Sequence, residues 1–350
     1  MRYLPALRLL EMQLTDVYLD NAAATRPCKQ ALEAFNEAIE LFANPSSGHA
    51  PGAGARELME RSRAIIAETV NAAPEEIIFT SGGTESNALA LNGRRHVTAS
   101  ILEHSSVREN ADELVSVGEL AAKPREGLVS CVYVCGENGA VQPIADIARE
   151  VKKHGALFHA DAVQAFGRID CDVRKSGVDF MSFSAHKIRG IRGAGALYVR
   201  KGANVKPLWR GGGQEGGLRA GTEALPLIAA FAAAARTPAP DTRPLLDFTL
   251  EMLREKLPGV IPVPPHEAPH ILSLELPGCP GQVMVRLLSD MGVYVSTGSA
   301  CARGKTSPIL KALNFKNADS VIRVSFGGMN TRADAERLID ALALALKRLQ

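Results

Sequence analysis

"GLVSCVYVC" (residues 127–135) is nearly all apolar, which is the pattern of a β-strand buried on both faces of a sheet. The next segment, "PIADIAREVKKH" (143–154), predicts a helix, because its apolar residues recur on one face and Pro143 suits a first turn. A second apolar run, "ALFHADA" (156–162), follows directly. This alternation predicts a mainly parallel sheet with helices on both sides.

The same pattern continues on either side of this unit. Further strands are expected in "EEIIFTSG" (75–82), "DFMSFSAHK" (179–187) and "GALYVRK" (195–201), and a buried helix in "LPLIAAFAAAA" (225–235). The fold class is therefore α/β.

A Pro-rich connector, "RTPAPDTRP" (236–244), marks a change in the chain. After it, helices over 245–257 and 282–291 and a last helix from Thr331 alternate with strands over 271–277 and 321–327. We expect a large domain over residues 16–237 and a smaller α+β domain over 238–350. Residues 1–15 are expected to be an extension that packs with the small domain or is disordered.

The composition is that of an ordinary soluble globular protein, with 46% hydrophobic and 22% charged residues among 350. The net charge is +2 and there is no long basic run, so no nucleic-acid partner is expected. No apolar run reaches membrane-spanning length, and charged residues interrupt the N-terminal segment, so neither a membrane span nor a signal peptide is expected. The six cysteines form no CxxC pair, which favours a reducing, cytoplasmic environment without disulfides or a metal site.

Three stretches carry candidate chemistry at the ends of expected strands. "TSGGTESNALAL" (80–91) joins a strand to a helix, and its glycines allow backbone amides to converge on an anion, with Ser81 and Thr84 as hydroxyl donors. "FHADAVQAFG" (158–167) places Asp161 at a strand's carboxyl end, followed by Gln164. "MSFSAHKIRGIRGAGALYV" (181–199) places Lys187 among small residues after a strand.

Each stretch has a plain structural alternative: an ordinary turn with Thr84 as helix N-cap, an aspartate that caps a turn, and a surface lysine. Together, however, the three provide a phosphate cradle, an acid for a pyridinium nitrogen and an amine for an aldehyde. These are the groups that a pyridoxal 5'-phosphate site requires. A fourth stretch, "VSTGSACARGKTSP" (295–308), places Cys301 in a polar loop of small residues that offers no apolar pocket, which suits an exposed, reactive thiol.

The order of these pieces resembles the class V aminotransferase family, and within it the cysteine desulfurases of the NifS/IscS type. The resemblance extends from Val17 to Gly327 and rests on "VYLDNAAATRP", "TSGGTESN", "EHSSV", "HADAVQAFG", "SFSAHKIRG", "GGGQEGGLRAGT", "STGSAC" and "SVIRVSFG". It implies fold type I of the pyridoxal phosphate enzymes, with a mainly parallel, seven-stranded type of sheet flanked by helices. It also implies that L-cysteine is converted to L-alanine and a persulfide on Cys301, whose sulfur passes to an acceptor protein, either a scaffold or a tRNA-thiolation enzyme.

The resemblance also assigns roles to individual residues. Lys187 would bind the cofactor aldehyde, and Asp161 would pair with the ring nitrogen. His104 would stack on the ring and transfer protons, and Gln164 would donate to the ring's 3-oxygen. The phosphate would be held by Gly83, Thr84, Ser184, His186 and, from the neighbouring subunit of a homodimer, Thr222. The substrate carboxylate would be bound by Asn21 and Arg323.

The chain departs from the family pattern in three places. "CGENG" (135–139) has Gly136 where the family has an asparagine that contacts the 3-oxygen region and the substrate. Ile191 stands where a proline is usual, and the segment between His104 and residue 127 is short, as if a hairpin and helix were absent. The first departure bears on rate or substrate choice. Selenocysteine lyase, another class V lyase or transaminase, and a non-catalytic sulfur-assembly partner therefore remain alternative functions.

Overall fold

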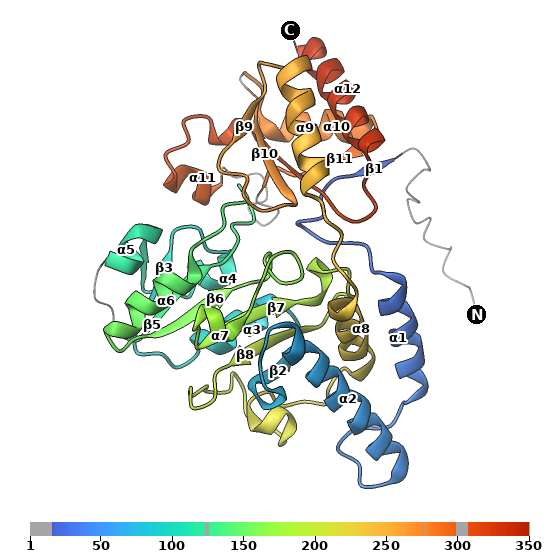
Figure 1. Cartoon of the computed structure of the whole chain (residues 1–350), viewed down its shortest axis with the longest axis vertical. Coiled ribbons are helices and arrows are strands. Elements are labelled where there is room, and N and C mark those ends of the chain that lie inside the picture. The colour runs from blue at the N-terminus through green and yellow to red at the C-terminus, as the bar shows by residue number, and fades with distance from the viewer. Residues whose placement is uncertain (1–15, 123–125, 277, 299–306, 350) are drawn as a thin grey trace, which may run out of the picture.

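The computed structural model describes residues 16–122, 126–276, 278–298 and 307–349. In Figure 1, the lower part of the molecule is a large sheet with the helices that surround it. The upper part is a smaller group of helices and strands, formed mainly by the C-terminal third of the chain. Cys301 lies outside the described residues.

The large sheet has seven strands and confirms the predicted α/β fold. All neighbouring pairs are parallel except those of β8, which is antiparallel to both β2 and β7. The spatial order is β2 (Ile77–Thr80), β8 (Gly195–Val199), β7 (Phe180–Ser184), β6 (Leu157–Asp161), β5 (Leu128–Val132), β3 (Val97–Ser100) and β4 (Glu113–Val115).

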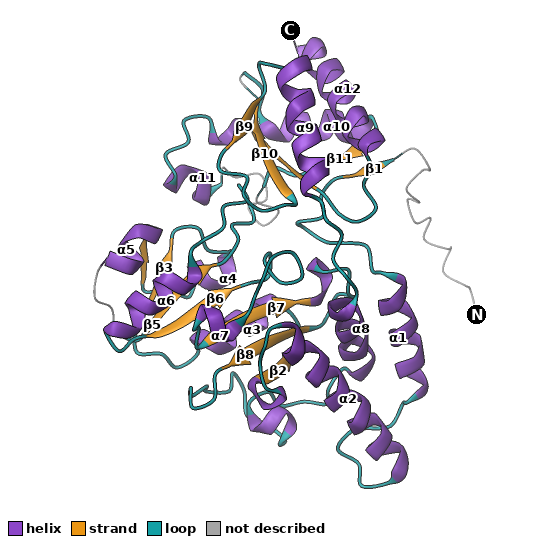
Figure 2. Cartoon of the chain, in the orientation of Figure 1, coloured by secondary structure: helices purple, strands orange, loops and turns teal. Residues whose placement is uncertain are grey.

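Helices cover both faces of this sheet, as Figure 2 shows. On one face, the side chains of alternate strand residues form a core with α1, α2, α6 and α8, in which Phe158, Met181 and Phe183 are fully buried. On the other face, α3 packs through Leu89 and Leu91. The bounds are α1 (Lys29–Glu40), α2 (Ala50–Thr69), α3 (Gly83–Leu91), α4 (Ser105–Arg108), α5 (Val117–Ala122), α6 (Ile144–Lys153), α7 (Val173–Ser176) and α8 (Leu225–Arg236).

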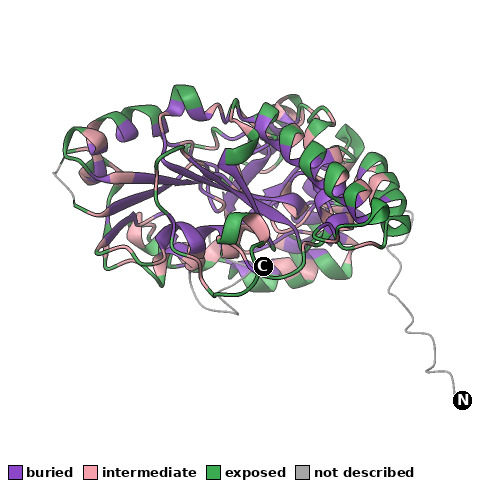
Figure 3. Cartoon of the chain, turned by 90° about the horizontal axis from the view of Figure 1, so that it is seen from below, coloured by how far each residue is buried: buried purple, intermediate pink, exposed green. Residues whose placement is uncertain are grey.

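Burial explains why the central strands have continuous apolar runs. In β5, all five residues are buried, and Figure 3 shows the strands of the sheet as the buried interior beneath helices with exposed outer faces. A strand covered on both sides has no solvent face that would select polar side chains. Three short 3-10 helices, η1 (Pro74–Glu76), η2 (Ala185–Lys187) and η3 (Gln214–Gly217), connect elements around this sheet.

The upper part has its own hydrophobic core and a three-stranded antiparallel sheet in the order β12, β10, β9. Its elements are α9 (Arg243–Lys256), β9 (Ile261–Val263), β10 (Ile271–Glu275), α10 (Gly281–Asp290), β11 (Val293–Tyr294), α11 (Pro308–Ala312), η5 (Ala318–Ser320), β12 (Val321–Ser325) and α12 (Arg332–Leu349). The N-terminal strand β1 (Val17–Tyr18) pairs with β11, and Val17 and Leu19 join this core (Figure 1). The division into domains at residue 237 stays a prediction.

The segment that the resemblance marks as short still contains α4, β4 and α5. Strand β4 extends the sheet by pairing parallel with β3. Among the described residues, no helix is long and apolar enough to cross a membrane.

Candidate active site

A cavity of about 790 Å³ lies at the carboxyl ends of β5, β6 and β7. In a parallel sheet, this edge is where ligands bind. Both the sheet and the C-terminal part contribute to its walls. The predicted site residues that line it are Gly83, Thr84, His104, Asp161, Gln164, Ser184, His186, Lys187 and Arg323.

The first turn of α3 forms one end of the cavity. Gly82 is its N-cap, at φ 156°. Because glycine has no side chain, Gly82 makes no side-chain hydrogen bond to the first amides of the helix. A Cβ on Gly83 would lie 2.5 Å from Val163 Cγ2, so only glycine fits there without displacing Val163. Ser184 adjoins this turn: a Cβ on Gly83 would lie 3.7 Å from Ser184 Cβ. Exposed amides at a helix N-terminus, with a hydroxyl beside them, suit an anion.

His186 completes this end of the cavity. Its Nδ1 is 2.9 Å from Ser184 Oγ. Burial, with the nearby positive charges of Lys187 and Arg192, lowers the pKa of His186 to about 4. A neutral imidazole can bind the serine hydroxyl and still offer one N–H as a donor.

Asp161 ends β6 and is 3% exposed. Its Oδ2 accepts from Asn87 Nδ2 at 2.7 Å, and its Oδ1 accepts from the Val163 amide at 3.0 Å. Asn87 Nδ2 also donates to Ser106 Oγ at 2.9 Å, so one amide group holds both Asp161 and the segment beside His104.

His104 is the N-cap of α4. Its Nδ1 accepts from the Ser106 amide at 3.2 Å and lies 2.8 Å from Ser106 Oγ. Because Nδ1 accepts a hydrogen bond, the proton of the neutral ring belongs on Nε2. The N-cap geometry therefore selects one tautomer of a histidine that lines the cavity.

Lys187 follows β7, in η2. Its Nζ donates to the carbonyl oxygens of Ala22 at 2.5 Å and Ala23 at 2.9 Å. Ala22 O also accepts from Gln164 Nε2 at 2.8 Å. The loop after β1 therefore places two backbone acceptors against the predicted cofactor lysine.

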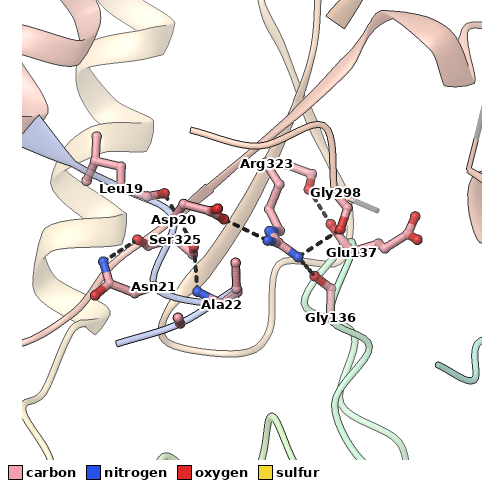
Figure 4. Close-up of polar contacts among 12 residues, drawn as sticks. Leu19, Asp20, Asn21, Ala22, Gly136, Glu137, Gly298, Arg323 and Ser325 are labelled. Atoms are coloured by element: carbon pink, nitrogen blue, oxygen red, sulfur yellow. Dashed lines mark hydrogen bonds and ion pairs between the residues drawn. The ribbon is translucent and has the colours of Figure 1, made fainter. Parts of the chain in front are cut away.

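Arg323, in the middle of β12, is 4% exposed and joins four segments of the chain, as Figure 4 shows. Its Nη2 donates to Asp20 Oδ1 at 2.8 Å, and its Nη1 donates to the Gly136 and Gly298 carbonyls, both at 2.8 Å. Its Nε is buried and has no hydrogen-bond partner among the described residues. A buried charged donor without a partner is costly, so it marks a place for an acceptor that a ligand would supply.

Two predicted site residues do not line the cavity. Asn21 Nδ2 donates to Ser325 O at 2.9 Å and to Asn330 Oδ1 at 3.1 Å, so its amide holds the strand that carries Arg323 (Figure 4). Thr222 is exposed, in the segment after η3. Together with η3, that segment is tied to helices α2 and α3 by the ion pairs of Glu215 with Arg63 and of Arg219 with Glu85.

Three buried polar residues at the cavity were given no role by the sequence analysis: Asn87, Glu103 and Glu137. Each stands inside a quoted motif, in "TSGGTESN", "EHSSV" and "CGENG". The sequence did contain a clue to each of them, namely a polar residue at a position where burial is expected. What the motifs did not contain is the identity of the partners.

Glu103 is fully buried beside Asp161. Burial, and repulsion from Asp161, raise the pKa of Glu103 well above its usual value. Ser130 Oγ donates to Glu103 Oε1 at 3.1 Å and lies 2.8 Å from His159 Nδ1, whose Nε2 is 3.0 Å from Ser182 Oγ. A row of buried polar groups therefore runs from the cavity wall across β5, β6 and β7.

Glu137 lies where the C-terminal part closes over the cavity. Its carboxylate accepts from Ser307 Oγ, the N-cap of α11, and its backbone carbonyl accepts from Ser273 Oγ. Burial raises the pKa of Glu137. Glu137 thus joins the segment after β5 to both β10 and α11.

The residues present fit pyridoxal phosphate. The open turn of α3, with Ser184 and His186, suits a phosphate. Asp161 suits a protonated ring nitrogen, and Lys187 an aldehyde. The orphaned Nε of Arg323 suits the carboxylate of an amino acid.

Comparisons with known proteins agree with this arrangement. The family model for class-V aminotransferases matches residues 17–118 and 110–338. The chain is 37% identical to a NifS/IcsS protein homolog of Lactobacillus delbrueckii subsp. bulgaricus, over 93% of this chain and 96% of that protein. It is 34% identical to a cysteine desulfurase of Cereibacter sphaeroides, over 95% of this chain and 96% of that protein.

Solved structures give the same result. A NifS-like protein superposes with a TM-score of 0.87 at 31% identity, covering 95% of this chain and 100% of that one. SspA in complex with cysteine superposes with a TM-score of 0.77 at 29% identity, covering 90% of this chain and 100% of that one.

Proposed function

Because this chain belongs to the class V aminotransferase family, we propose that it is a pyridoxal phosphate-dependent L-cysteine desulfurase. The observation that carries the proposal is the single cavity that brings together Lys187, Asp161, His104 and the open turn of α3. The similarity to a cysteine desulfurase and to a cysteine-bound structure supports cysteine as the substrate.

The cofactor supplies an electron sink that makes the bonds at the substrate's α- and β-carbons labile. The protein supplies the rest. Asp161 holds a proton on the ring nitrogen, and Asn87 and the Val163 amide keep its carboxylate in place. The first amides of α3, with Ser184 and His186, would hold the phosphate, and Gln164 would donate to the 3-oxygen.

Two groups move protons in this scheme. Lys187 Nζ would act as acid and base at the substrate α-carbon. His104 presents Nε2–H, because Ser106 occupies its Nδ1. Its proton would go to the substrate β-carbon, which receives the electron pair of the broken carbon–sulfur bond.

Arg323 binds the substrate carboxylate in this proposal. Its Nε has no partner among the described residues, while Asp20 and two carbonyls hold the rest of the guanidinium. In this proposal, Asn21 holds β12, the strand that carries Arg323, in place. Direct contact between Asn21 and substrate stays a prediction.

Cys301 is the proposed sulfur acceptor and lies outside the described residues. Only two residues separate it from Gly298, a cavity-lining residue, and an extended residue spans up to about 3.6 Å, so the thiol can reach the cavity. Its thiolate attacks the substrate sulfur: the carbon–sulfur bond breaks, a sulfur–sulfur bond forms, and the carbon takes up a proton. The products are L-alanine and the Cys301 persulfide, which passes its outer sulfur to an acceptor protein.

We also propose a homodimer in which Thr222 contributes to the phosphate site of the neighbouring subunit. Thr222 is exposed and does not line its own chain's cavity, and the two ion pairs that anchor its segment support a fixed presentation to a second copy.

The test is a product assay on purified protein. With L-cysteine and a reductant, we expect alanine and sulfide in equal amounts. Without reductant, brief incubation should add about 32 Da, the mass of one sulfur, to the peptide that contains Cys301. Cys301→Ser should bind the cofactor normally but release no alanine. Added sulfur on Cys135 instead would contradict the assignment of the nucleophile.

A further inference from the structure

We propose that His270 is a positioning residue for Gln164, holding its carboxamide so that the amide nitrogen, and not the oxygen, faces the cavity. This inference rests on the proposed function, because the orientation matters when an oxygen atom of the cofactor lies beside the amide. His270 immediately precedes β10 and is 1% exposed. It is not one of the cavity-lining residues.

The orientation of the amide follows from its two neighbours. Ala22 O is an acceptor, so the atom of Gln164 that lies 2.8 Å from it must be Nε2. Gly136 lies on the same side, since a Cβ built on it would be 3.5 Å from Nε2. Both Ala22 and Gly136 line the cavity, so the amide nitrogen is the atom at the cavity wall.

The oxygen of the amide faces the other way. Gln164 Oε1 is 3.3 Å from His270 Nε2, and since a carboxamide oxygen only accepts, His270 Nε2 must carry the hydrogen. This leaves Nδ1 of the neutral ring as an acceptor, and Nδ1 is buried without a hydrogen-bond partner in the part of the chain that the structure describes.

The surroundings keep His270 neutral. Its pKa is lowered well below the usual value by burial and by four nearby cations, Arg168, Arg323, Lys187 and Arg243. A neutral ring in this tautomer has one donor, and that donor is used on Gln164. If the amide were turned over, its oxygen would meet Ala22 O and its nitrogen would meet the Nε2–H donor. Moving the ring proton to Nδ1 would restore only the second contact, and it would leave a buried N–H without an acceptor among the described residues.

His270 therefore fixes the orientation of the Gln164 carboxamide from the side away from the cavity. A turned amide would present an oxygen to the electron-rich 3-oxygen of the cofactor, where the native amide presents an N–H. Gly136 adds no side chain on the cavity side, so among the described contacts the orientation depends on Ala22 O and on His270.

The test compares four variants of the full-length protein loaded with cofactor: His270→Leu, His270→Gln, Gln164→Ala and the double variant His270→Leu/Gln164→Ala. Leucine removes the donor, whereas glutamine places an amide N–H near the position of Nε2. Two quantities are measured: the dissociation constant of the cofactor, and the pH midpoint between its absorption bands. His154→Leu is the matched control, because His154 is an exposed histidine at the C-terminal end of α6 and does not line the cavity.

We expect His270→Leu to weaken cofactor binding about three- to tenfold, the effect of one neutral hydrogen bond, and to shift the pH midpoint. His270→Gln should restore both quantities, and it remains informative if His270→Leu fails to fold. The double variant should resemble Gln164→Ala, because His270 acts through Gln164.

Other outcomes would overturn the inference. Wild-type values in His270→Leu, or additive losses in the double variant, would mean that His270 does not act through Gln164. A loss in His270→Gln as large as in His270→Leu would assign a purely structural role. Wild-type protein that binds no cofactor would overturn the proposed function itself, and the role of His270 with it.

Discussion

The cavity has two walls that are built in different ways. The sheet wall consists of Asp161, Ser184, His186 and Lys187 at the ends of β6 and β7, together with the first turn of α3. The closing wall consists of Ala22, Gly136, Gly298 and Arg323, from segments up to about 300 residues apart in the chain. Strand pairing places the residues of the sheet wall, whereas side chains that reach across segments hold the closing wall.

The difference predicts how each wall responds to substitution. In the sheet wall, the pairing of Val132 with Asp161 and of Asp161 with Ser182 fixes the backbone, so a substitution removes one chemical group and leaves its neighbours in place. In the closing wall, Arg323 is itself the connection between Asp20, Gly136 and Gly298, so its loss removes a binding group and the geometry around it.

The largest effect is expected at Lys187 in the sheet wall. Lys187→Ala should abolish covalent attachment of the cofactor and lower kcat by about a hundred- to ten-thousand-fold, the range for a lost general acid–base. Reduction with borohydride followed by mass spectrometry checks the attachment. Lys201→Ala, an exposed lysine, is the control and should be normal. Retained borohydride-stable cofactor in Lys187→Ala would refute the assignment.

The closing wall is tested at Arg323. Arg323→Leu should lower kcat/KM for cysteine about ten- to hundredfold, because charge-assisted hydrogen bonds to the carboxylate are lost. The thermal midpoint should fall as well, since Asp20 and two carbonyls lose their common donor. Arg323→Lys keeps the charge but not the fork and should recover activity only in part. An unchanged KM with a lower midpoint would assign Arg323 to structure alone.

A smaller effect is expected for Asn87, which holds Asp161 in the sheet wall. Asn87→Ala should weaken cofactor binding roughly tenfold, because the Asp161 carboxylate loses its 2.7 Å partner while the backbone keeps its position. Equilibrium dialysis of the cofactor measures this change. The control is Asn92→Ala at the other end of α3, since Asn92 also donates two hydrogen bonds but lies away from the cavity. Equal losses in both variants would indicate a general effect on the helix.

The smallest effect on activity is expected for Glu103→Gln, within about threefold, because the folded protein already holds a neutral side chain there. Its signature is the pH dependence of stability. The pKa of Glu103 is raised by burial and by Asp161, so the folded chain keeps a proton that the unfolded chain loses.

The stability that Glu103 contributes is therefore full below the pKa of an unfolded glutamate, about 4.3, and decreases as the pH rises through the folded pKa. Glu103→Gln should remove this decrease, so its thermal midpoint should gain on the wild type between pH 5 and pH 8. Glu255→Gln, an exposed glutamate, should follow the wild type. Parallel curves for wild type and Glu103→Gln would mean that Glu103 is ionised in the folded protein.

The sheet wall was largely predictable from the sequence. Asp161 and Lys187 follow apolar runs, and a residue at the carboxyl end of a parallel strand lies at the ligand edge whatever the loops do. The turn at Gly82 and Gly83 has a comparably local signal. Asn87 was missed because its partner Asp161 is 74 residues away in the sequence, and a local pattern does not reveal a contact over that separation.

The closing wall was predictable only in part. The sequence pointed to Arg323 but not to Asp20 as its partner, and it did not reveal that the Asn21 amide holds β12. Sequence order also separated the N-terminal strand from the C-terminal core, although β1 pairs with β11. Such contacts depend on packing between distant segments, and the hydrophobic periodicity of the sequence does not reveal which segments pack together.

The sequence by itself determined the α/β fold, the strand-end lysine and aspartate, and the glycine turn, because each follows from local backbone preference and from burial repeated along one segment. Only the tertiary structure decided which buried polar groups meet: Asn87 with Asp161, Arg323 with Asp20, and His270 with Gln164. A buried polar group must find a partner, but many partners satisfy that requirement equally well. The folded chain selects one by bringing distant strands and loops to the same cavity.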